Sequence, residues 1–506
     1  MGISYARMDG PPGWRRHQEL RRADTCGSLH GGVPADADTV AAMSILALDL
    51  GTSSVRGLVL DDRAVPLPGA LARRSVEVAV DDSGAATLDA AAYLAALVEC
   101  LDDLHGAGHL DGVRLVAASS QWHSVVPLDR AGAPLGPLVT WLDTRPAPPP
   151  GTAGPADPHA FHQRTGAWWH RFYWTVKLPW LRARSGPGLV RFTGLPEFVL
   201  GALLTEAPMS VSLASGTGML DLGRLDWDAE SLAVAGVTRA EVPPLAPAGW
   251  RGRLRGEYAR RWPALAAVPW APPTGDGAAS NVGSGCIDPS RAAVTVGTSA
   301  AVRLVQPVAP GAPLPPLPDS VWRYRVDRER IVTGAAYSAG GNLFAWASKT
   351  LQLPAGDALE RELSSITPGR TEVRTDPRLG GDRPPGTAPS GAGALSGLAF
   401  STSATEIFAG LMDGVCAMVA RDLATLESTV DRTVEVVLGG GAVAAQPWWR
   451  RAFQAALAPR AVRHVDNPEV GAAGAALLAA GLVPAARPPG GLGERSERGQ
   501  QSPADG

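Results

Sequence analysis

The sequence predicts an α/β protein made of two related lobes, and three observations lead to this prediction. A Gly-Thr-Ser turn occurs twice, as D-L-G-T-S-S-V-R from Asp49 and as T-V-G-T-S-A-A-V-R from Thr295, and each copy runs into an apolar strand. Strand-like and helix-like segments alternate in both halves, which is typical of α/β folds. At 506 residues the chain is also too long for one ordinary core, so two domains are expected.

The first half opens with a hairpin. An apolar run over 44–48 ends at Asp49, and a second strand over 55–60 follows the turn. The elements expected after it are a helix, two strands, a Pro-rich loop and an aromatic-rich helical region, at 88–104, 113–119 and 125–128, 146–156, and 160–240.

The second half repeats this plan from Ala292, with strand, turn and strand. The clearest amphipathic helix is predicted over 405–426. A strand at 434–438 is broken by Gly439, Gly440 and Gly441, and helices are expected to follow through Leu457 and over 469–482. The Pro/Gly-rich segments 306–320 and 372–394 are expected to be loops.

Composition excludes several classes of protein. A net charge of −3 gives no general attraction to nucleic acid or to an anionic membrane surface. The chain has no apolar run near the roughly 20 residues of a membrane span. The four cysteines are far apart in sequence, so they form no C-x-x-C pair, and a reduced, cytoplasmic setting fits. We expect residues 1–43 to be a disordered extension or a misplaced start, and 486–506 to be a disordered tail.

The two turns predict a phosphate site. Short Gly/Thr/Ser turns present backbone N–H groups and hydroxyls that suit phosphate oxygens. Two such turns, one in each half, indicate lobes that close on a single polyphosphate, as in a nucleotide-using enzyme. For either turn alone, an ordinary hairpin would be the simpler interpretation. Neither a Walker A lysine motif nor a G-x-G-x-x-G after the first strand is present.

Three further features suggest phosphoryl-transfer chemistry. Asp276 lies between two glycines, which makes it a candidate general base, although a turn or N-cap aspartate is the alternative. Asp49 ends a buried strand beside the first turn and is a candidate Mg²⁺ ligand, directly or through water; a turn-stabilising role is the alternative. The glycines 439–441 would let a flat adenine or ribose approach the backbone, unless they only start a helix.

Taken in order, these motifs resemble the FGGY carbohydrate kinases over roughly 44–482. V-V-L-G-G-G-A-V then resembles the family's adenosine motif. The resemblance implies two ribonuclease-H-like (actin-like ATPase) domains, 44–285 and 286–485, with ATP and a sugar in the cleft between them. It places the base at Asp276 and implies that both turns bind Mg-ATP, through Gly51, Thr52, Ser53, Ser54 and Arg56 and through Gly297, Thr298 and Ser299.

Within the family, the resemblance is closest to gluconate kinases. W-H-S-V at 122–125, T-W-L-D-T-R at 140–145 and G-D-G-A-A-S-N-V-G at 275–283 carry it. It implies phosphorylation of D-gluconate to 6-phosphogluconate. Polyols need paired donors and acceptors beside a flat apolar wall. The expected sugar-binding residues are Gln121, Trp122, His123, Trp141, Asp143, Arg145, His170, Lys177 and Asp276, with His170, Lys177 or Arg145 as the cation for the C1 carboxylate.

Two departures from the family pattern and two alternatives remain. Ala445 stands where glycerol kinases have an asparagine that contacts adenine, and G-G-D-R-P-P at 380–385 replaces the usual G-E-R-A-P, so Asp382 keeps an acid that is one methylene shorter. A xylulokinase-type or other pentulose or polyol kinase is the alternative substrate class. A non-catalytic actin-like nucleotide-binding protein is the more remote alternative. A homodimer is a candidate assembly.

Overall fold

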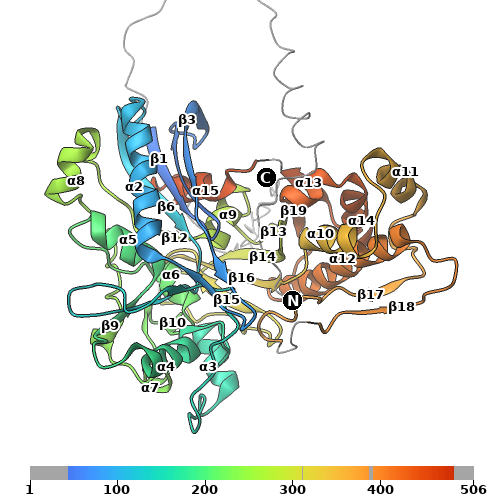
Figure 1. Ribbon diagram of the computed structural model, residues 1–506, viewed down its shortest axis with the longest axis horizontal. Coiled ribbons are helices and arrows are strands. Elements are labelled where there is room, and N and C mark those ends of the chain that lie inside the picture. The colour runs from blue at the N-terminus through green and yellow to red at the C-terminus, as the bar shows by residue number, and fades with distance from the viewer. Residues whose placement is uncertain (1–43, 310, 387–390, 466, 484–506) are drawn as a thin grey trace, which may run out of the picture.

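Two mixed β-sheets form the centre of the molecule, one in each half of the chain (Figure 1). The computed structural model describes residues 44–309, 311–386, 391–465 and 467–483, so the expectations for both chain ends lie outside the described residues. No helix in these ranges is both long and apolar enough to cross a membrane.

The first sheet has the strand order β12-β6-β1-β2-β3. β1 (Ser44–Leu50) pairs antiparallel with β2 (Ser54–Leu60), which pairs antiparallel with β3 (Pro66–Ser75). On the other side of β1, β6 (Val113–Ser120) and β12 (Thr274–Gly275) run parallel to it. Every residue of β1 is buried, which explains its continuous apolar sequence. Helix α2 (Ala90–Gly106), capped by Asp89, packs against β2 and β3.

The second sheet repeats this arrangement in the order β15-β16-β14-β13-β19-β20. The central strand β13 (Arg291–Val296) pairs antiparallel with β14 (Ala300–Pro307) and parallel with β19 (Glu435–Gly439), as β1 does with β2 and β6. The remaining strands are β15 (Trp322–Arg325), β16 (Arg330–Tyr337) and β20 (Val462–Val465). The duplicated turns therefore occupy equivalent places in equivalent sheets.

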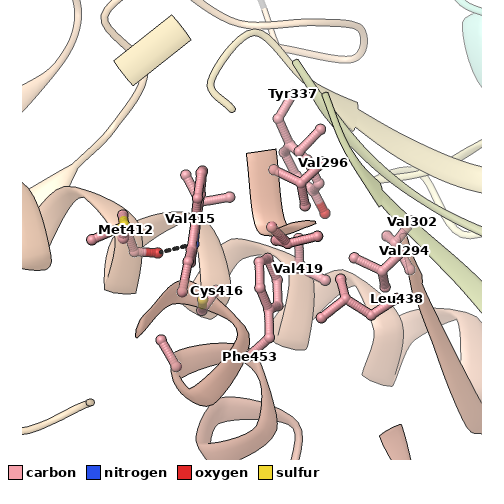
Figure 2. Close-up of a cluster of buried hydrophobic side chains, with 14 of the residues drawn as sticks. Val294, Val296, Val302, Tyr337, Met412, Val415, Cys416, Val419, Leu438 and Phe453 are labelled. Atoms are coloured by element: carbon pink, nitrogen blue, oxygen red, sulfur yellow. Dashed lines mark hydrogen bonds between the residues drawn. The ribbon is translucent and has the colours of Figure 1, made fainter. Parts of the chain in front are cut away.

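The core of the second half lies between its sheet and the long helix α12 (Ala404–Ser428) (Figure 2). Val415 and Val419 of α12 face Val294 and Val302 of the sheet, and all four are fully buried. A capping box at Ser403 and Glu406 starts α12. The surrounding helices are α10 (Asn342–Thr350), α11 (Asp357–Ser365), α13 (Gly441–Ala445) and α14 (Pro447–Leu457).

The last helix, α15 (Val470–Ala479), returns to the first half and packs on α9 (Asp276–Gly283), β1 and β6 (Figure 1). The two helices cross closely at glycines, since a Cβ at Gly283 would overlap the Val470 carbonyl and one at Gly474 would overlap that of Ala279. The chain therefore passes between the halves at two adjacent helices.

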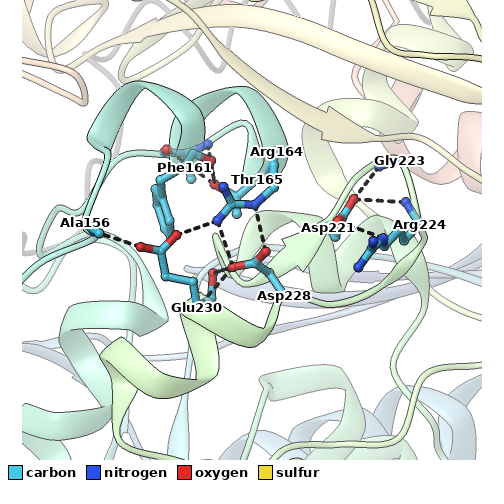
Figure 3. Close-up of polar contacts among 11 residues, drawn as sticks. Ala156, Phe161, Arg164, Thr165, Asp221, Gly223, Arg224, Asp228 and Glu230 are labelled. Carbon is cyan, nitrogen blue, oxygen red and sulfur yellow. Dashed lines mark hydrogen bonds and ion pairs between the residues drawn. The ribbon is translucent and has the colours of Figure 1, made fainter.

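The aromatic-rich part of the first half adds further helices and short strands around the first sheet. Helix α3 (Pro158–Thr165) is held by Arg164, whose Nε donates to Asp228 at 3.0 Å and whose Nη2 donates to Glu230 at 2.6 Å; Glu230 also accepts from the Ala156 amide (Figure 3). The other elements here are α4 (Trp174–Ser185), α5 (Leu195–Leu203), α6 (Val211–Gly216), α7 (Ala229–Ala235), α8 (Gly256–Arg261), β7 (Val126–Leu128), β8 (Leu138–Val139), β9 (Arg191–Thr193), β10 (Leu220–Asp221) and β11 (Asp226–Trp227).

The predicted hairpins and the long helices are confirmed, and several strands were missed. β3 is mostly exposed and mixed in character, while β15 and β16 follow a Pro-rich loop that gave no strand signal. The expected loop 372–394 contains β17 (Arg374–Asp376), which pairs with β18 (Ala394–Ser396) at the end of that segment. Pairing between distant segments, not local sequence, determines such short strands.

Candidate active site

The first turn, residues 51–53, is held by side chains from three other segments. The Gly51 carbonyl accepts from the Tyr93 hydroxyl at 2.9 Å and from Gln121 Nε2 at 3.3 Å. The Thr52 hydroxyl accepts from Trp141 Nε1 at 2.8 Å and donates to Gln121 Oε1 at 3.3 Å. Gln121 is buried and, unlike Trp141, is not among the described residues that line the cavity below, so it positions the turn.

Asp49 lies directly behind this turn and is paired with Arg56 across the β1–β2 hairpin. Its Oδ1 accepts from Ser119 at 2.7 Å, and its Oδ2 accepts from Arg56 Nε at 3.0 Å and from Arg56 Nη2. Arg56 Nη1 also donates to both Glu469 oxygens, at 3.1 and 3.0 Å, just before α15. Burial lowers the pKa of Arg56, but the two carboxylates outweigh it and raise that pKa overall.

The second turn rests on the connection between β16 and α10. Gly341 N donates to the Gly297 carbonyl at 2.7 Å, and Asn342 N donates to that of Thr298 at 3.2 Å. A Cβ at Gly340 would come within 2.6 Å of the Ser299 carbonyl carbon. Sequence reasoning missed this support, although the Gly340-Gly341 pair after a strand was an available signal.

The three glycines after β19 have different surroundings. Gly440 has φ 107°, and a Cβ there would overlap the Val296 carbonyl, so packing at the end of β13 requires this glycine. Gly441 is exposed and has open space at its Cβ position, whereas Gly439 lies near the Val465 carbonyl. Close approach of a ligand therefore explains at most Gly441.

A cavity of about 170 Å³ opens between the two halves. Thr52 of the first turn and Ser299 of the second both line it, together with Asp276. The remaining lining is an aromatic wall with a few polar groups: Trp122, His123, Trp141, Phe172, Tyr173, Arg303, Trp322, Tyr324 and Arg383, with Ala300, Ala301, Ala336 and Pro384.

Asp276 is the first residue of α9, and it is an exposed residue that lines this cavity. Its Oδ1 accepts from the Gly277 amide at 2.7 Å. Poor hydration among the surrounding protein atoms raises its pKa to about 6, against the opposing charge of Arg303. The flanking glycines make room for Trp122, since a Cβ at Gly275 would overlap its indole and one at Gly277 would come within 2.6 Å of its Cζ3. Packing of the Trp122 ring therefore accounts for both glycines.

His123 presents a neutral imidazole to the cavity. Burial, then the charges of Lys177 and Arg383, hold its pKa well below its usual value. Its Nδ1 faces the Gly216 carbonyl, so in the neutral ring Nδ1 carries the proton and Nε2 is an acceptor.

The cations expected for a substrate carboxylate do not line the cavity among the described residues. Lys177 is fully buried, and its ammonium donates to the carbonyls of His123 at 2.8 Å and Thr140 at 2.9 Å. Arg145 Nη2 pairs with Asp143 Oδ2 at 2.6 Å, and Asp143 is buried. His170 accepts from the Phe172 amide, and burial lowers its pKa to about 4, so its ring is neutral.

Two arginines that the sequence analysis did not select lie in the cavity instead. Arg303 comes from β14, and Arg383 stacks over the Trp141 ring with its guanidinium carbon 4.2 Å from the ring centre. Asp382, the acid noted in the same loop, pairs with Arg378 at 2.9 Å. Residue spacing gave no signal for Arg303, because alternation along a strand does not show which of its two faces meets a cavity.

Within the described residues, no group of three or more His, Cys, Asp and Glu side chains is arranged to hold a metal ion. Mg²⁺ needs fewer protein ligands, because it keeps several waters and binds substrate phosphates. Asp49 fits such a site through water, since its side chain is 13% exposed and both its oxygens already accept hydrogen bonds.

Comparison with known proteins identifies the family to which this two-lobed α/β architecture belongs. The model of the FGGY family of carbohydrate kinases, N-terminal domain, matches residues 44–283, and that of the C-terminal domain matches 292–482. Gluconokinase of Bacillus subtilis (strain 168) is 26% identical over 361 residues, covering 67% of this chain and 68% of its own. Xylulose kinase of Streptomyces rubiginosus is 28% identical over 457 residues, covering 87% and 88%. The structure of gluconate kinase from Lactobacillus acidophilus superposes with a TM-score of 0.73 at 22% identity, covering 87% of this chain and 89% of that one.

The chain belongs to the FGGY family of carbohydrate kinases. The predicted fold of two ribonuclease-H-like, actin-like domains is thereby confirmed. The similarity to the gluconate kinase structure shows the fold alone.

Proposed function

We propose that the protein transfers the γ-phosphoryl group of ATP to a hydroxyl of a sugar acid, with D-gluconate as acceptor and 6-phosphogluconate as product. The observation that carries this proposal is the single cavity lined by Thr52, Ser299 and Asp276, because it brings both turns and a carboxylate to one place. Phosphoryl transfer depends mainly on such positioning and on charge neutralisation.

In this mechanism Asp276 is the general base. Its carboxylate accepts the proton of the acceptor hydroxyl while that oxygen bonds to the γ-phosphorus and ADP leaves. A pKa of about 6 leaves it ionised at neutral pH and still basic enough to take the proton. The two turns would hold the phosphates from opposite sides, and Mg²⁺ would supply charge neutralisation near Asp49.

The acceptor would lie along the aromatic wall. Trp122, Trp322 and Tyr324 pack edge to face or stacked, with ring centres 4.5 to 6.3 Å apart, and offer flat surfaces to the C–H groups of a polyol. His123 Nε2 offers an acceptor to a hydroxyl.

The second candidate is a ketose such as D-xylulose. The similarity to the xylulose kinase of Streptomyces rubiginosus extends over more of this chain than that to the Bacillus gluconokinase. The deciding experiment measures ADP release with gluconate, xylulose, glycerol and no acceptor, followed by NMR of the product to locate the phosphate. Faster turnover with xylulose would favour this second candidate. Failure of every acceptor to raise turnover above background would refute the kinase proposal and favour a non-catalytic nucleotide-binding protein.

A further inference from the structure

Arg303 places a charged side chain in the cavity between the two halves. It lies on β14, in register with Gly334 of β16, which is in turn in register with Trp322 of β15. Its Nε and Nη1 are buried and have no hydrogen-bond partner among the described residues. Asp276 is close enough to raise its pKa by charge, but burial is stronger and lowers that pKa overall. Buried unpaired donors on a cation are costly, so such groups usually serve a ligand.

The neighbouring backbone is shaped to admit this guanidinium. A Cβ at Gly334 would come within 3.1 Å of Arg303 Cγ and 3.0 Å of Trp322 Cζ2. A Cβ at Gly277 would come within 3.0 Å of Arg303 Nε. Glycines on two elements of different halves thus make room for one arginine, and both Arg303 and Trp322 line the cavity.

The place of Arg303 along its strand assigns it to the acceptor side of the cavity. It follows Ser299 by four residues, which in an extended strand is about 13 Å. Its neighbours across the sheet are Ala293 and Gly334, and Trp322 of the aromatic wall lies one strand beyond Gly334; none of them belongs to a phosphate turn. Of the cations first expected here, Lys177 is engaged with two carbonyls and Arg145 with Asp143. Arg383, the other arginine that lines the cavity, stacks on Trp141.

We propose that the Arg303 guanidinium binds the carboxylate of a sugar-acid acceptor and thereby selects aldonates over neutral polyols and ketoses. This inference rests on the proposed kinase function and specifies its substrate class. Two N–H groups of a guanidinium match the two oxygens of a carboxylate, an arrangement that a neutral C1 group cannot reproduce.

The test compares Arg303→Met, which keeps the length of the side chain without its charge, with Arg303→Lys and with the wild type. Arg361→Met, on the exposed side of α11, is the matched control. The acceptors are D-gluconate and D-glucitol, its neutral six-carbon counterpart. We expect Arg303→Met to raise KM for gluconate about 10- to 100-fold, the range for losing a charge-assisted hydrogen bond, while KM for glucitol and KM for ATP stay unchanged. The assays are run at about pH 8.5, because loss of the Arg303 charge raises the pKa of Asp276 further. Arg303→Lys should recover part of the loss.

An unchanged KM for gluconate in Arg303→Met would overturn the inference. So would an equal fall of kcat with both acceptors or a raised KM for ATP, since Arg303 would then serve phosphoryl transfer. Binding of gluconate without ATP, measured by calorimetry, separates this inference from the proposed function. If the wild type binds gluconate but phosphorylates nothing, and Arg303→Met does not bind it, the kinase proposal fails and the carboxylate site stands. If the wild type does not bind gluconate but phosphorylates a ketose, the carboxylate site fails and the kinase stands.

Discussion

The indole of Trp122 occupies the space that a side chain at Gly275 would require. Its Nε1 donates to the Ser212 carbonyl at 3.0 Å, which fixes the ring against the start of α9. Trp122 thus packs beneath Asp276 and also lines the cavity, so the proposed sugar wall and the proposed base are positioned by the same contact.

We therefore expect Gly275→Ala to displace Trp122 and lower activity. Overpacking of this kind typically costs about 1–3 kcal/mol, measurable as a lower free energy of unfolding in urea. The fall in kcat should exceed what the small loss of folded protein explains, because the Asp276 backbone shifts with the start of α9. In the Trp122→Ala background, Gly275→Ala should lower the free energy of unfolding by less than it does in the wild type. If the two substitutions are simply additive, the contact is not the reason for the glycine.

Replacing Asp276 with Asn tests the base. The amide keeps the size of the side chain but cannot accept the hydroxyl proton, so kcat should fall about 10²- to 10⁴-fold. The melting temperature should stay close to that of the wild type, because the carboxyl makes one local hydrogen bond, to the Gly277 amide. Retention of more than a tenth of the wild-type kcat, in a preparation free of native enzyme, would exclude Asp276 as the base.

The pH dependence follows from the raised pKa of the same carboxyl. Below about pH 6 the carboxyl is protonated and cannot take the proton, so kcat/KM should fall as the pH drops through 6 and level off above it. His123 should not contribute, because its pKa lies well below its usual value. A profile from pH 4.5 to 8.5 measures this. If the fall in kcat/KM at acid pH keeps the same midpoint in Asp276→Glu, a different group is responsible for it.

Part of the candidate site was predictable, because the residues proposed for its chemistry lie in short local motifs. Asp49, both turns and Asp276 lie in short segments whose residue types predict a metal ligand, phosphate-binding turns and a base. The structure brings Thr52, Ser299 and Asp276 to one cavity. Strand alternation likewise made the hairpins recognisable.

The acceptor side was less predictable, because it is assembled from distant segments. Arg303, Trp322 and Arg383 lie in the cavity only because β14, β15 and the loop after β17 meet the first half there. Lys177 was expected to bind the substrate carboxylate, but its place in the sequence does not show which way its side chain points, and its ammonium donates to two buried carbonyls. The glycines around Asp276 were correctly noted, but the partner that explains them, Trp122, is more than 150 residues away in sequence.

Replacement of Lys177 should affect folding stability and acceptor binding, but not ATP binding. Its buried ammonium joins the carbonyls of His123 and Thr140, the two segments that supply cavity residues His123 and Trp141. Lys177→Met leaves both carbonyls without this donor, so we expect a loss of about 1–3 kcal/mol per carbonyl in the free energy of unfolding. KM for the acceptor should rise, while KM for ATP changes little.

The difference in free energy of unfolding between the wild type and Lys177→Met should depend on pH, because the lysine changes its protonation on folding. Burial lowers the pKa of Lys177 to about 7, below its ordinary value of 10.5, so between these values the unfolded chain binds more protons than the folded protein. The wild type should therefore gain stability relative to Lys177→Met as the pH rises from 7 to 10, as measured by urea unfolding at each pH. A constant difference over this range would show that the ammonium does not change its protonation on folding, and that its pKa is not lowered.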